Sequence, residues 1–466
     1  MSSNTTSSNL TAGFIDLATY DEPEKYMYGG DNGTVTYFVK KLRKSTWFTI
    51  APTVLSISGG NPGFGQNWGY KISRAGDYLL RTWLRIQLPA VTLSGLYLPN
   101  GWNANDCNIR WTRNLAHNLV KEINISFNDL VAERMDSYFL DFWAAFTVPA
   151  GKANGYNNMI GNYAELVDPL AVLGNNNPNT LPAAILNLPL PFFYARDTGV
   201  ALPTAAIPYN DMVHYVTFRN LEEVLIVDNT ATNTSIPCQT SMLSVSNPEL
   251  RCDMWAEYAI VSNVERAQMG KAPRDILMEQ VQTAPKQQFT ATNTQNYDIR
   301  FAHSIKALFF AVRNKTNPAE QSNYSSASPV PLATGVNFAP SLGGDPIAGT
   351  TLAYENTNRL VNMGSDYFSL IVPYYTAISI PRETGYHLLS YTLDLVNTNP
   401  MGSTNYGKLT NVSFQFTASA DAIAATTGPF AATLGAASAQ QYETIIVGVN
   451  MNIIRISGGA LGFPIL

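Results

Sequence analysis

The sequence predicts an all-β protein of the sandwich or barrel type. Short runs rich in β-branched and aromatic residues recur along the chain, and 32 Gly and 27 Pro among the 466 residues interrupt them. Helical periodicity is rare, and charged residues make up only 14% of the chain. Closely spaced strands with turn residues between them are typical of antiparallel sheets that pack face to face or close into a barrel.

Individual strands are expected wherever apolar and polar residues alternate. Residues 34–39, 77–87 and 119–127 alternate in this way, the first of them directly after a Gly-rich turn. Further short β-type runs are residues 213–218, 256–261, 305–312, 387–395 and 444–456. The glycine-rich stretch 59–65 lacks the Lys-Ser/Thr that follows in a phosphate-binding loop, so we interpret it as a strand connection.

Two helices are predicted between these strands. Asn128 or Asp129 is expected to cap a helix from Leu130 to Phe146, because aromatic residues recur there at helical spacing. A second helix is expected to start at the capping-box pattern 262–265 and to stop near Gly270. It lies between two strand-rich halves, which suggests an interdomain connector.

A weak internal repeat suggests that one β-domain has been duplicated. A strand ending at Phe127 leads to the pair Tyr138-Phe139, and the strand 350–354 leads to Tyr367-Phe368. The two Tyr-Phe pairs lie 229 positions apart (367 − 138), close to half the chain. Chance similarity between aromatic-rich segments is the alternative.

The composition favours a protein that assembles with partners. The net charge is only −5, while Tyr is abundant at 24 residues. Faces that are covered by partners lose charge and gain aromatic residues, although secreted β-proteins can look similar. Low charge disfavours disorder and coiled coils, and a negative net charge disfavours direct nucleic-acid binding.

No catalytic, cofactor or metal motif emerges from the sequence. We therefore expect no enzyme activity and no cofactor. The basic cluster 40–44 is either a solvated strand edge protected by lysines or a contact for an acidic partner or lipid head groups. The four histidines and three cysteines stand in no recognised ligand or nucleophile spacing, and no disulfide is expected: His117, His214, His303, His387, Cys107, Cys238 and Cys252.

The chain resembles the major capsid proteins of iridoviruses, within the large double-stranded DNA viruses of eukaryotes. Matching segments run through nearly the whole chain; they include residues 13–19 (GFIDLAT), 26–30 (YMYGG), 74–78 (RAGDY), 109–111 (IRW), 155–162 (GYNNMIGN), 188–193 (LPLPFF), 354–360 (YENTNRL), 402–407 (GSTNYG) and 452–456 (NIIRI). The regions 174–182, 317–345 and 417–439 match least, and we expect variable surface loops there.

The resemblance implies two tandem eight-stranded jelly-roll sandwiches. The implied parts are an N-terminal arm (1–27), a first jelly roll (28–262), a connector (263–284) and a second jelly roll (285–466). It also implies a virion protein, assembled in the host cytoplasm, whose homotrimers tile an icosahedral shell around an internal membrane and a DNA genome. Its expected partners are copies of itself, minor capsid proteins and penton proteins, with the membrane nearby and no direct nucleic-acid contact.

Four residues are candidates for interfaces. Trp143 and Phe146 are expected at the trimer or domain junction, and Phe14 and Ile15 in an arm that faces inward under the shell. A carbohydrate-binding jelly-roll protein of the secretory pathway is the alternative. It predicts a signal peptide, paired cysteines or an acidic calcium site, and we expect none of them.

Overall fold

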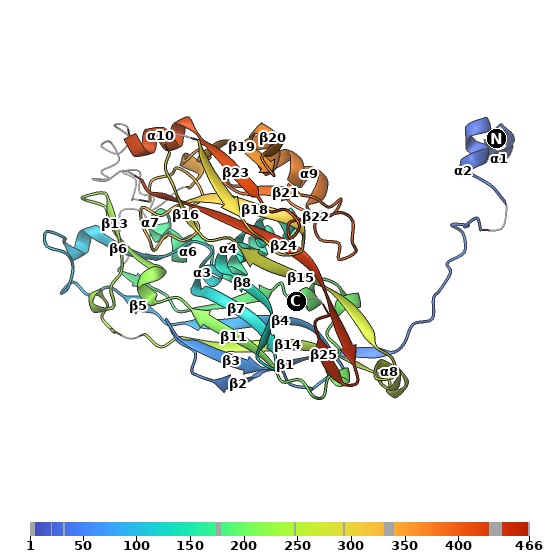
Figure 1. Cartoon of the computed structure of the whole chain (residues 1–466), viewed down its shortest axis with the longest axis horizontal. Helices are drawn as coiled ribbons and strands as arrows, with labels where there is room; N and C mark the ends of the chain where they lie inside the picture. Colours follow the sequence, from blue (N-terminus) through green and yellow to red (C-terminus); the bar gives the residue numbers. More distant parts are fainter. Residues whose placement is uncertain are drawn as a thin grey trace. The chain divides into compact units, whose positions relative to one another are not determined.

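The computed structural model describes residues 5–19, 21–30, 33–173, 179–246, 248–291, 294–329, 340–427 and 440–464. The chain divides into two compact units, Met1–Trp47 and Phe48–Leu466. The larger unit contains all the strands of the described chain (Figure 1).

The N-terminal unit contains two helices, α1 (Thr5–Ala18) and α2 (Glu22–Met27). Asp21 and Glu24 form a capping box that starts α2. The prediction of a strand at residues 34–39 is wrong. These residues form turns and irregular chain, and their apolar side chains are exposed. Alternation produces a strand only where a partner strand pairs with it, and none does here. The basic cluster 40–44 lies in the same irregular segment and is therefore not a strand edge.

The first half of the larger unit is a sandwich of two principal antiparallel sheets. One sheet has the order β1 (Phe48–Val54), β14 (Arg251–Val261), β4 (Tyr78–Leu88), β10 (Ala184–Leu190). The other has the order β2 (Ser56–Gly59), β3 (Asn67–Lys71), β11 (Met212–Phe218), β7 (Val120–Phe127), β8 (Leu130–Asp136). Their apolar faces meet in a common core, in which Leu84 and Ile86 of β4 are fully buried.

The second half repeats this arrangement. One sheet has the order β15 (Arg274–Thr283), β24 (Tyr442–Ser457), β18 (Ser304–Asn314), β21 (His387–Ser390), with β16 (Gln287–Phe289), β22 (Thr404–Asn405) and β25 (Ala460–Gly462) added at its margins. The other has the order β17 (Gln295–Ile299), β23 (Val412–Ala418), β19 (Ile347–Tyr354), β20 (Thr357–Gly364). Phe310 packs between them against Phe368 and Phe416, with ring centroids 5.3 and 5.5 Å apart.

The strand order identifies each half as a jelly roll. The eight principal strands of the first half, in chain order, are β1, β3, β4, β7, β8, β10, β11 and β14, and those of the second are β15, β17, β18, β19, β20, β21, β23 and β24. In both halves one sheet joins the first, eighth, third and sixth strands, and the other joins the second, seventh, fourth and fifth. Two sheets of this kind form a jelly roll, so the predicted double jelly roll is confirmed.

The internal repeat corresponds to a hairpin followed by a helix in each half. Asn128 and Asp129 have φ of 49° and 65°, and Glu355 and Asn356 have φ of 48° and 64°. Two adjacent left-handed residues form the type I′ turn that joins hairpin strands. The turns connect β7 to β8 and β19 to β20.

The predicted start of the first helix is wrong, because the hairpin takes up its first residues. Residues 130–136 form β8, and the helix α4 (Ser137–Thr147) starts only after Asp136, whose carboxylate accepts a hydrogen bond from Phe139 N at 2.8 Å. The equivalent segment after β20 is the π-helical turn η8 (Tyr367–Ile371), which continues into α9 (Val372–Thr376). The second predicted helix is confirmed as α8 (Asn263–Met269), which is capped by Ser262 and connects β14 to β15.

The remaining elements decorate the sandwiches. The helices are α3 (Leu115–Leu119), α5 (Ala150–Ile160), α6 (Ala164–Val167), α7 (Pro169–Leu173) and α10 (Ala420–Thr427). Two small sheets join β13 (Thr234–Pro237), β12 (Leu225–Asn229) and β6 (Cys107–Trp111), and β5 (Val91–Thr92) with β9 (Thr180–Leu181). Short 3-10 turns are η1 (Ala104–Asp106), η2 (Phe193–Ala195), η3 (Thr198–Val200), η4 (Thr204–Ala206), η5 (Leu221–Glu223), η6 (Thr240–Met242) and η7 (Pro340–Leu342).

Candidate functional site

The junction between the two sandwiches combines buried aromatic contacts with buried ion pairs. On its apolar side, α4 of the first sandwich lies against β18 of the second (Figure 1). The rings of Phe139, Phe142 and Phe146 surround Phe309, with centroids 6.3, 5.9 and 5.6 Å from it. All four rings are fully buried, so they supply the apolar contact that holds the sandwiches together.

Trp143 lies on the same helix and holds a buried arginine in place. The guanidinium carbon of Arg196 is 3.5 Å from the centroid of the Trp143 ring. Arg196 Nε also lies 3.7 Å from the carboxylate of Glu279, which accepts a hydrogen bond from Lys306 Nζ at 2.6 Å. Burial lowers the pKa of Arg196, while Glu279 and Glu133 oppose that effect. Trp143 thus stabilises a cation of the first sandwich beside an anion of the second.

A fully buried ion trio links the sandwiches at another point. Arg110 of β6 donates from Nε to Asp228 at 2.7 Å and from Nη1 to Glu320 of the second half at 2.5 Å. Thr112 Oγ1 donates to the other Glu320 oxygen at 3.2 Å. Burial alone lowers the pKa of Arg110, but the two carboxylates outweigh it and the net pKa is raised. Arg110 therefore stays charged, and its two anionic partners compensate its burial.

Glu320 belongs to an irregular loop, residues 315–329, which we call the junction loop. It follows β18, and most of its residues are buried. A buried loop must satisfy its polar groups within the protein. Gln321 N donates to Thr112 Oγ1 at 3.1 Å, and Asn118 Nδ2 donates to Ser322 Oγ at 2.6 Å.

The junction loop corrects a further expectation. Of the variable surface loop expected at 317–345, residues 317–329 are mostly buried, and Glu320, Gln321 and Ser322 form hydrogen bonds with the first sandwich. Polar composition signals exposure only when no other part of the protein supplies hydrogen-bond partners. The other expected surface segments lie partly outside the described residues, which omit 174–178, 330–339 and 428–439.

A His–Asp pair lies beside the junction loop. His117 Nδ1 is 2.6 Å from Asp141 Oδ1, and Tyr156 OH is 2.7 Å from His117 Nε2. The other oxygen of Asp141 accepts hydrogen bonds from Ser322 Oγ at 2.5 Å and from Tyr324 OH at 2.9 Å. In a hydrolytic triad the serine hydroxyl faces the histidine, whereas here it donates to the aspartate. The arrangement therefore connects α3, α4 and the junction loop without presenting a nucleophile.

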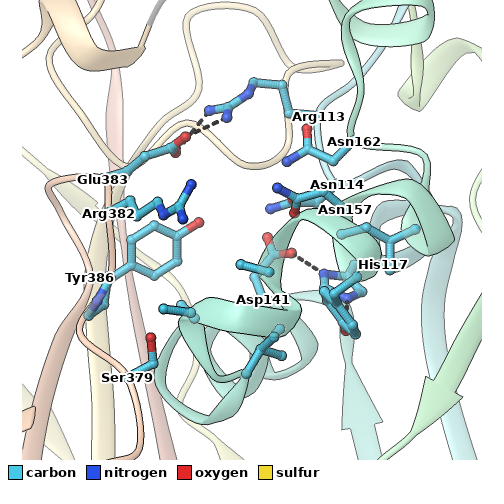
Figure 2. Close-up of a pocket in the computed structure, with 18 of the residues that line it drawn as sticks. Arg113, Asn114, His117, Asp141, Asn157, Asn162, Ser379, Arg382, Glu383 and Tyr386 are labelled. Atoms are coloured by element: carbon cyan, nitrogen blue, oxygen red, sulfur yellow. Dashed lines mark hydrogen bonds and ion pairs between the residues drawn. The ribbon is translucent and has the colours of Figure 1, made fainter.

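A cavity of about 180 Å³ opens beside this pair. Figure 2 shows the pair Arg113–Glu383 on one side of the cavity and the pair His117–Asp141 on another. Arg113 Nη1 donates to Glu383 Oε2 at 2.9 Å, and its other terminal nitrogen binds Glu383 Oε1, which forms a bidentate ion pair between the two halves. The pair Arg113–Glu383 thus links the two halves at the cavity, which suits a structural role.

Other residues singled out in the sequence take no part in the contacts described above. Phe14 and Ile15 lie on α1 of the N-terminal unit, and both are exposed. His214 is buried beside Tyr194 OH at 3.1 Å, and burial lowers its pKa to about 3. The described residues contain no group of three or more His, Cys, Asp or Glu side chains that could hold a metal ion.

Comparisons with known proteins identify the family. A family model described as the large eukaryotic DNA virus major capsid protein matches residues 265–462, and one described as the major capsid protein N-terminus matches residues 36–261. The major capsid protein of Costelytra zealandica iridescent virus is 57% identical over 467 residues, which cover 99% of both chains. That of Invertebrate iridescent virus 3 is 54% identical over 99% of this chain and 100% of its own.

The chain belongs to the major capsid proteins of large eukaryotic DNA viruses. Among solved structures, the capsid protein VP54 of PBCV-1, fitted into a reconstruction of the virophage Sputnik, aligns with a TM-score of 0.73 at 19% identity and covers 92% of this chain and 100% of its own. At that identity the likeness shows the fold alone, and it agrees with the two jelly rolls found here.

As a major capsid protein, the chain is a structural component of the virion shell and not an enzyme. This agrees with the geometry of the junction, where charged and aromatic side chains bind each other across the two sandwiches. Of the helices in the described residues, none has the length and apolar character needed to cross a membrane. The capsid protein role thus resides in shape and in contact surfaces.

Proposed function

We propose that three copies of this major capsid protein form a homotrimer with a pseudo-hexagonal outline. The observation that carries the proposal is that one chain holds two sandwiches with the same strand order, fixed to each other through the junction. Three such blocks supply six similar sandwiches, and a repeated head-to-tail contact forms a closed ring when its rotation closes.

These trimers tile the flat faces of an icosahedral shell that encloses an internal membrane and a double-stranded DNA genome. The net charge of −5 supports a shell that does not contact nucleic acid directly. Minor capsid and penton proteins complete the shell, and assembly takes place in the host cytoplasm.

We further propose the four parts implied by the sequence: an arm (1–27), a first jelly roll (28–262), a connector (263–284) and a second jelly roll (285–466). In this arrangement Phe14 and Ile15 face the shell interior, and their exposure on α1 supports a contact with another molecule. Trp143 and Phe146 act at the junction and keep the two sandwiches of each block in a fixed orientation.

The test is the mass and shape of the purified full chain. Light scattering should give three times the mass of one chain, and electron microscopy should show plates with a hexagonal outline. A stable monomer at micromolar concentration would contradict the proposal.

A further inference from the structure

The repeated hairpin and helix give the two sandwiches corresponding contact surfaces. In the first sandwich, Phe142 and Phe146 of α4 lie on Phe309 in the middle of β18. Phe309 is paired with Val447 of β24 and with Leu388 of β21, and all three are fully buried. The sheet of the second sandwich thus presents an apolar face on which the helix of the first one rests.

The corresponding helix of the second sandwich has no such cover within the described chain. With Tyr138-Phe139 aligned to Tyr367-Phe368, Ile371 and Tyr375 take the places of Phe142 and Phe146. Phe142 and Phe146 are 0% exposed, whereas Ile371 and Tyr375 are 45% and 76% exposed. Both belong to an exposed apolar surface, which we call the Tyr375 face: Leu370, Ile371, Tyr374 and Tyr375.

The Tyr375 face lies within a stretch without charge. Residues 367–381 contain no Asp, Glu, Lys or Arg. Val372 in the same helix packs towards the chain's own core, and Ser379 N donates to Phe146 O at 3.0 Å. The helical segment is therefore held by the junction on one side and presents apolar side chains on the other, which is characteristic of a contact surface.

The first sandwich carries the surface that corresponds to Phe309. Trp83 lies in the middle of β4, paired with Trp255 of β14 and with Pro189 of β10, and Trp255 is paired with Val54 of β1. The two tryptophan rings stack with centroids 6.0 Å apart, and both are partly exposed. We call these four residues the Trp83 face. Its strands occupy the same positions in their sheet as β18, β24, β21 and β15 do in theirs.

We infer that the Tyr375 face of one copy packs on the Trp83 face of a second copy and reproduces between chains the contact that α4 and Phe309 make within one chain. Such a contact joins different surfaces of two identical molecules, so it either closes into a ring or continues as a filament. With three copies it closes, and contacts within and between chains alternate around six sandwiches. The inference rests on the proposed trimer and assigns its contact residues.

A chemical cross-link tests the contact directly. The three native cysteines are buried, so a short bismaleimide will join only cysteines introduced at exposed positions. The full chain carrying both Tyr375→Cys and Pro189→Cys should give cross-linked dimers and trimers on a denaturing gel. The matched control, Val361→Cys with Pro189→Cys, uses an exposed residue of β20 in the same sandwich and should give none.

Light scattering of the same samples separates the two ways of failing. A trimer that gives no cross-link through Tyr375→Cys and Pro189→Cys overturns the assigned contact and leaves the proposed trimer intact. A wild-type chain that stays monomeric overturns the proposed function and the contact with it. In addition, Tyr375→Asp should abolish the trimer peak with an unchanged circular dichroism spectrum, while Val361→Asp should keep it; a trimer retained by Tyr375→Asp also counts against the contact.

Discussion

Glu320 accepts a hydrogen bond from Arg110 at 2.5 Å across 210 positions of sequence, and both side chains are fully buried. Each residue belongs to a different sandwich, so separating the halves would leave Arg110 with Asp228 alone of its two carboxylate partners and would take from Glu320 the guanidinium that it binds. The pair makes the relative orientation of the sandwiches part of the folded state rather than a consequence of a flexible tether.

Removing Glu320 tests this dependence. Glu320→Ala leaves Arg110 buried with one of its two carboxylate partners missing, and breaking a buried pair typically costs about 3–5 kcal/mol. Thermal unfolding should show a clearly lower midpoint. Asp275→Ala, which removes the exposed partner of Arg455, is the control and should shift the midpoint little. Equal shifts in the two variants would exclude a special role for the buried trio.

Trp143→Ala should weaken the junction and, through it, assembly. The variant takes away the ring that lies 3.5 Å from the buried Arg196 guanidinium, and a desolvated contact of this kind is worth about 2 kcal/mol. We expect a lower unfolding midpoint and a smaller trimer fraction in sedimentation. Trp47→Ala removes an exposed indole and should change neither. An unchanged trimer fraction in Trp143→Ala would argue against the proposed role in assembly.

Glu133 gives the junction a pH dependence. Burial raises its pKa to about 8 from an ordinary value of 4.5, in spite of Arg196 and the N–H of Phe193 nearby. The folded state therefore holds a proton that the unfolded state releases, so stability falls as the pH rises from about 4.5 to about 8.

The variant Glu133→Gln should flatten this dependence, because its amide stays neutral while it can still accept the hydrogen bond from Phe193 N. Urea unfolding at a series of pH values from about 5 to about 8.5 measures the effect, because this range lies between and around the unfolded-state and folded-state pKa values of Glu133. The gain in the free energy of unfolding should be largest at the alkaline end. Glu249→Gln changes an exposed carboxylate and serves as the control. A wild-type slope retained by Glu133→Gln would assign the pH dependence to another group.

The three cysteines should be unreactive in the native protein. Burial raises the pKa of Cys107 to about 11 and those of Cys238 and Cys252 to about 12, so little thiolate exists at neutral pH. An aromatic disulfide reagent should release no colour until denaturant is added, and should then titrate three thiols per chain. Val361→Cys provides an exposed thiol that should react at once. Rapid reaction of the unmodified native chain would contradict the burial.

The N-terminal arm should be protected in assembled particles. If Phe14 and Ile15 face the shell interior, protease added to intact particles should leave the first 28 residues uncut, while the free chain, whose α1 is exposed, is cut there. Mass spectrometry of the digested samples shows whether the arm was cut in the particles and in the free chain. Ready cleavage in intact particles would place the arm outside.

Much of the fold could be predicted because strands and turns leave local signals. The runs 119–127 and 444–456 became β7 and β24, and the repeat of Tyr-Phe pairs located the equivalent helices. The start of α4 could not be predicted, because Asn128 and Asp129 suit both a helix cap and a left-handed turn. Only pairing of residues 130–136 with β7 decides between them.

The contacts at the junction could not be predicted from the sequence for a related reason. Arg110 lies between Ile109 and Trp111, and a charge between two apolar residues is a local signal that we did not use in the sequence analysis. Its partners Asp228 and Glu320 are 118 and 210 positions away, and nothing local connects them. The Asn- and Ser-rich junction loop looks like surface until the opposite sandwich is in place.

The connection of β14 to β15 through α8 fixes the relative amounts in which the two sandwiches are made. Because one polypeptide carries both sandwiches, every ribosome that finishes a chain delivers the two in equal number. A ring of six sandwiches, as in the proposed trimer, then needs two associations between molecules instead of five, and neither sandwich is made in excess of the other.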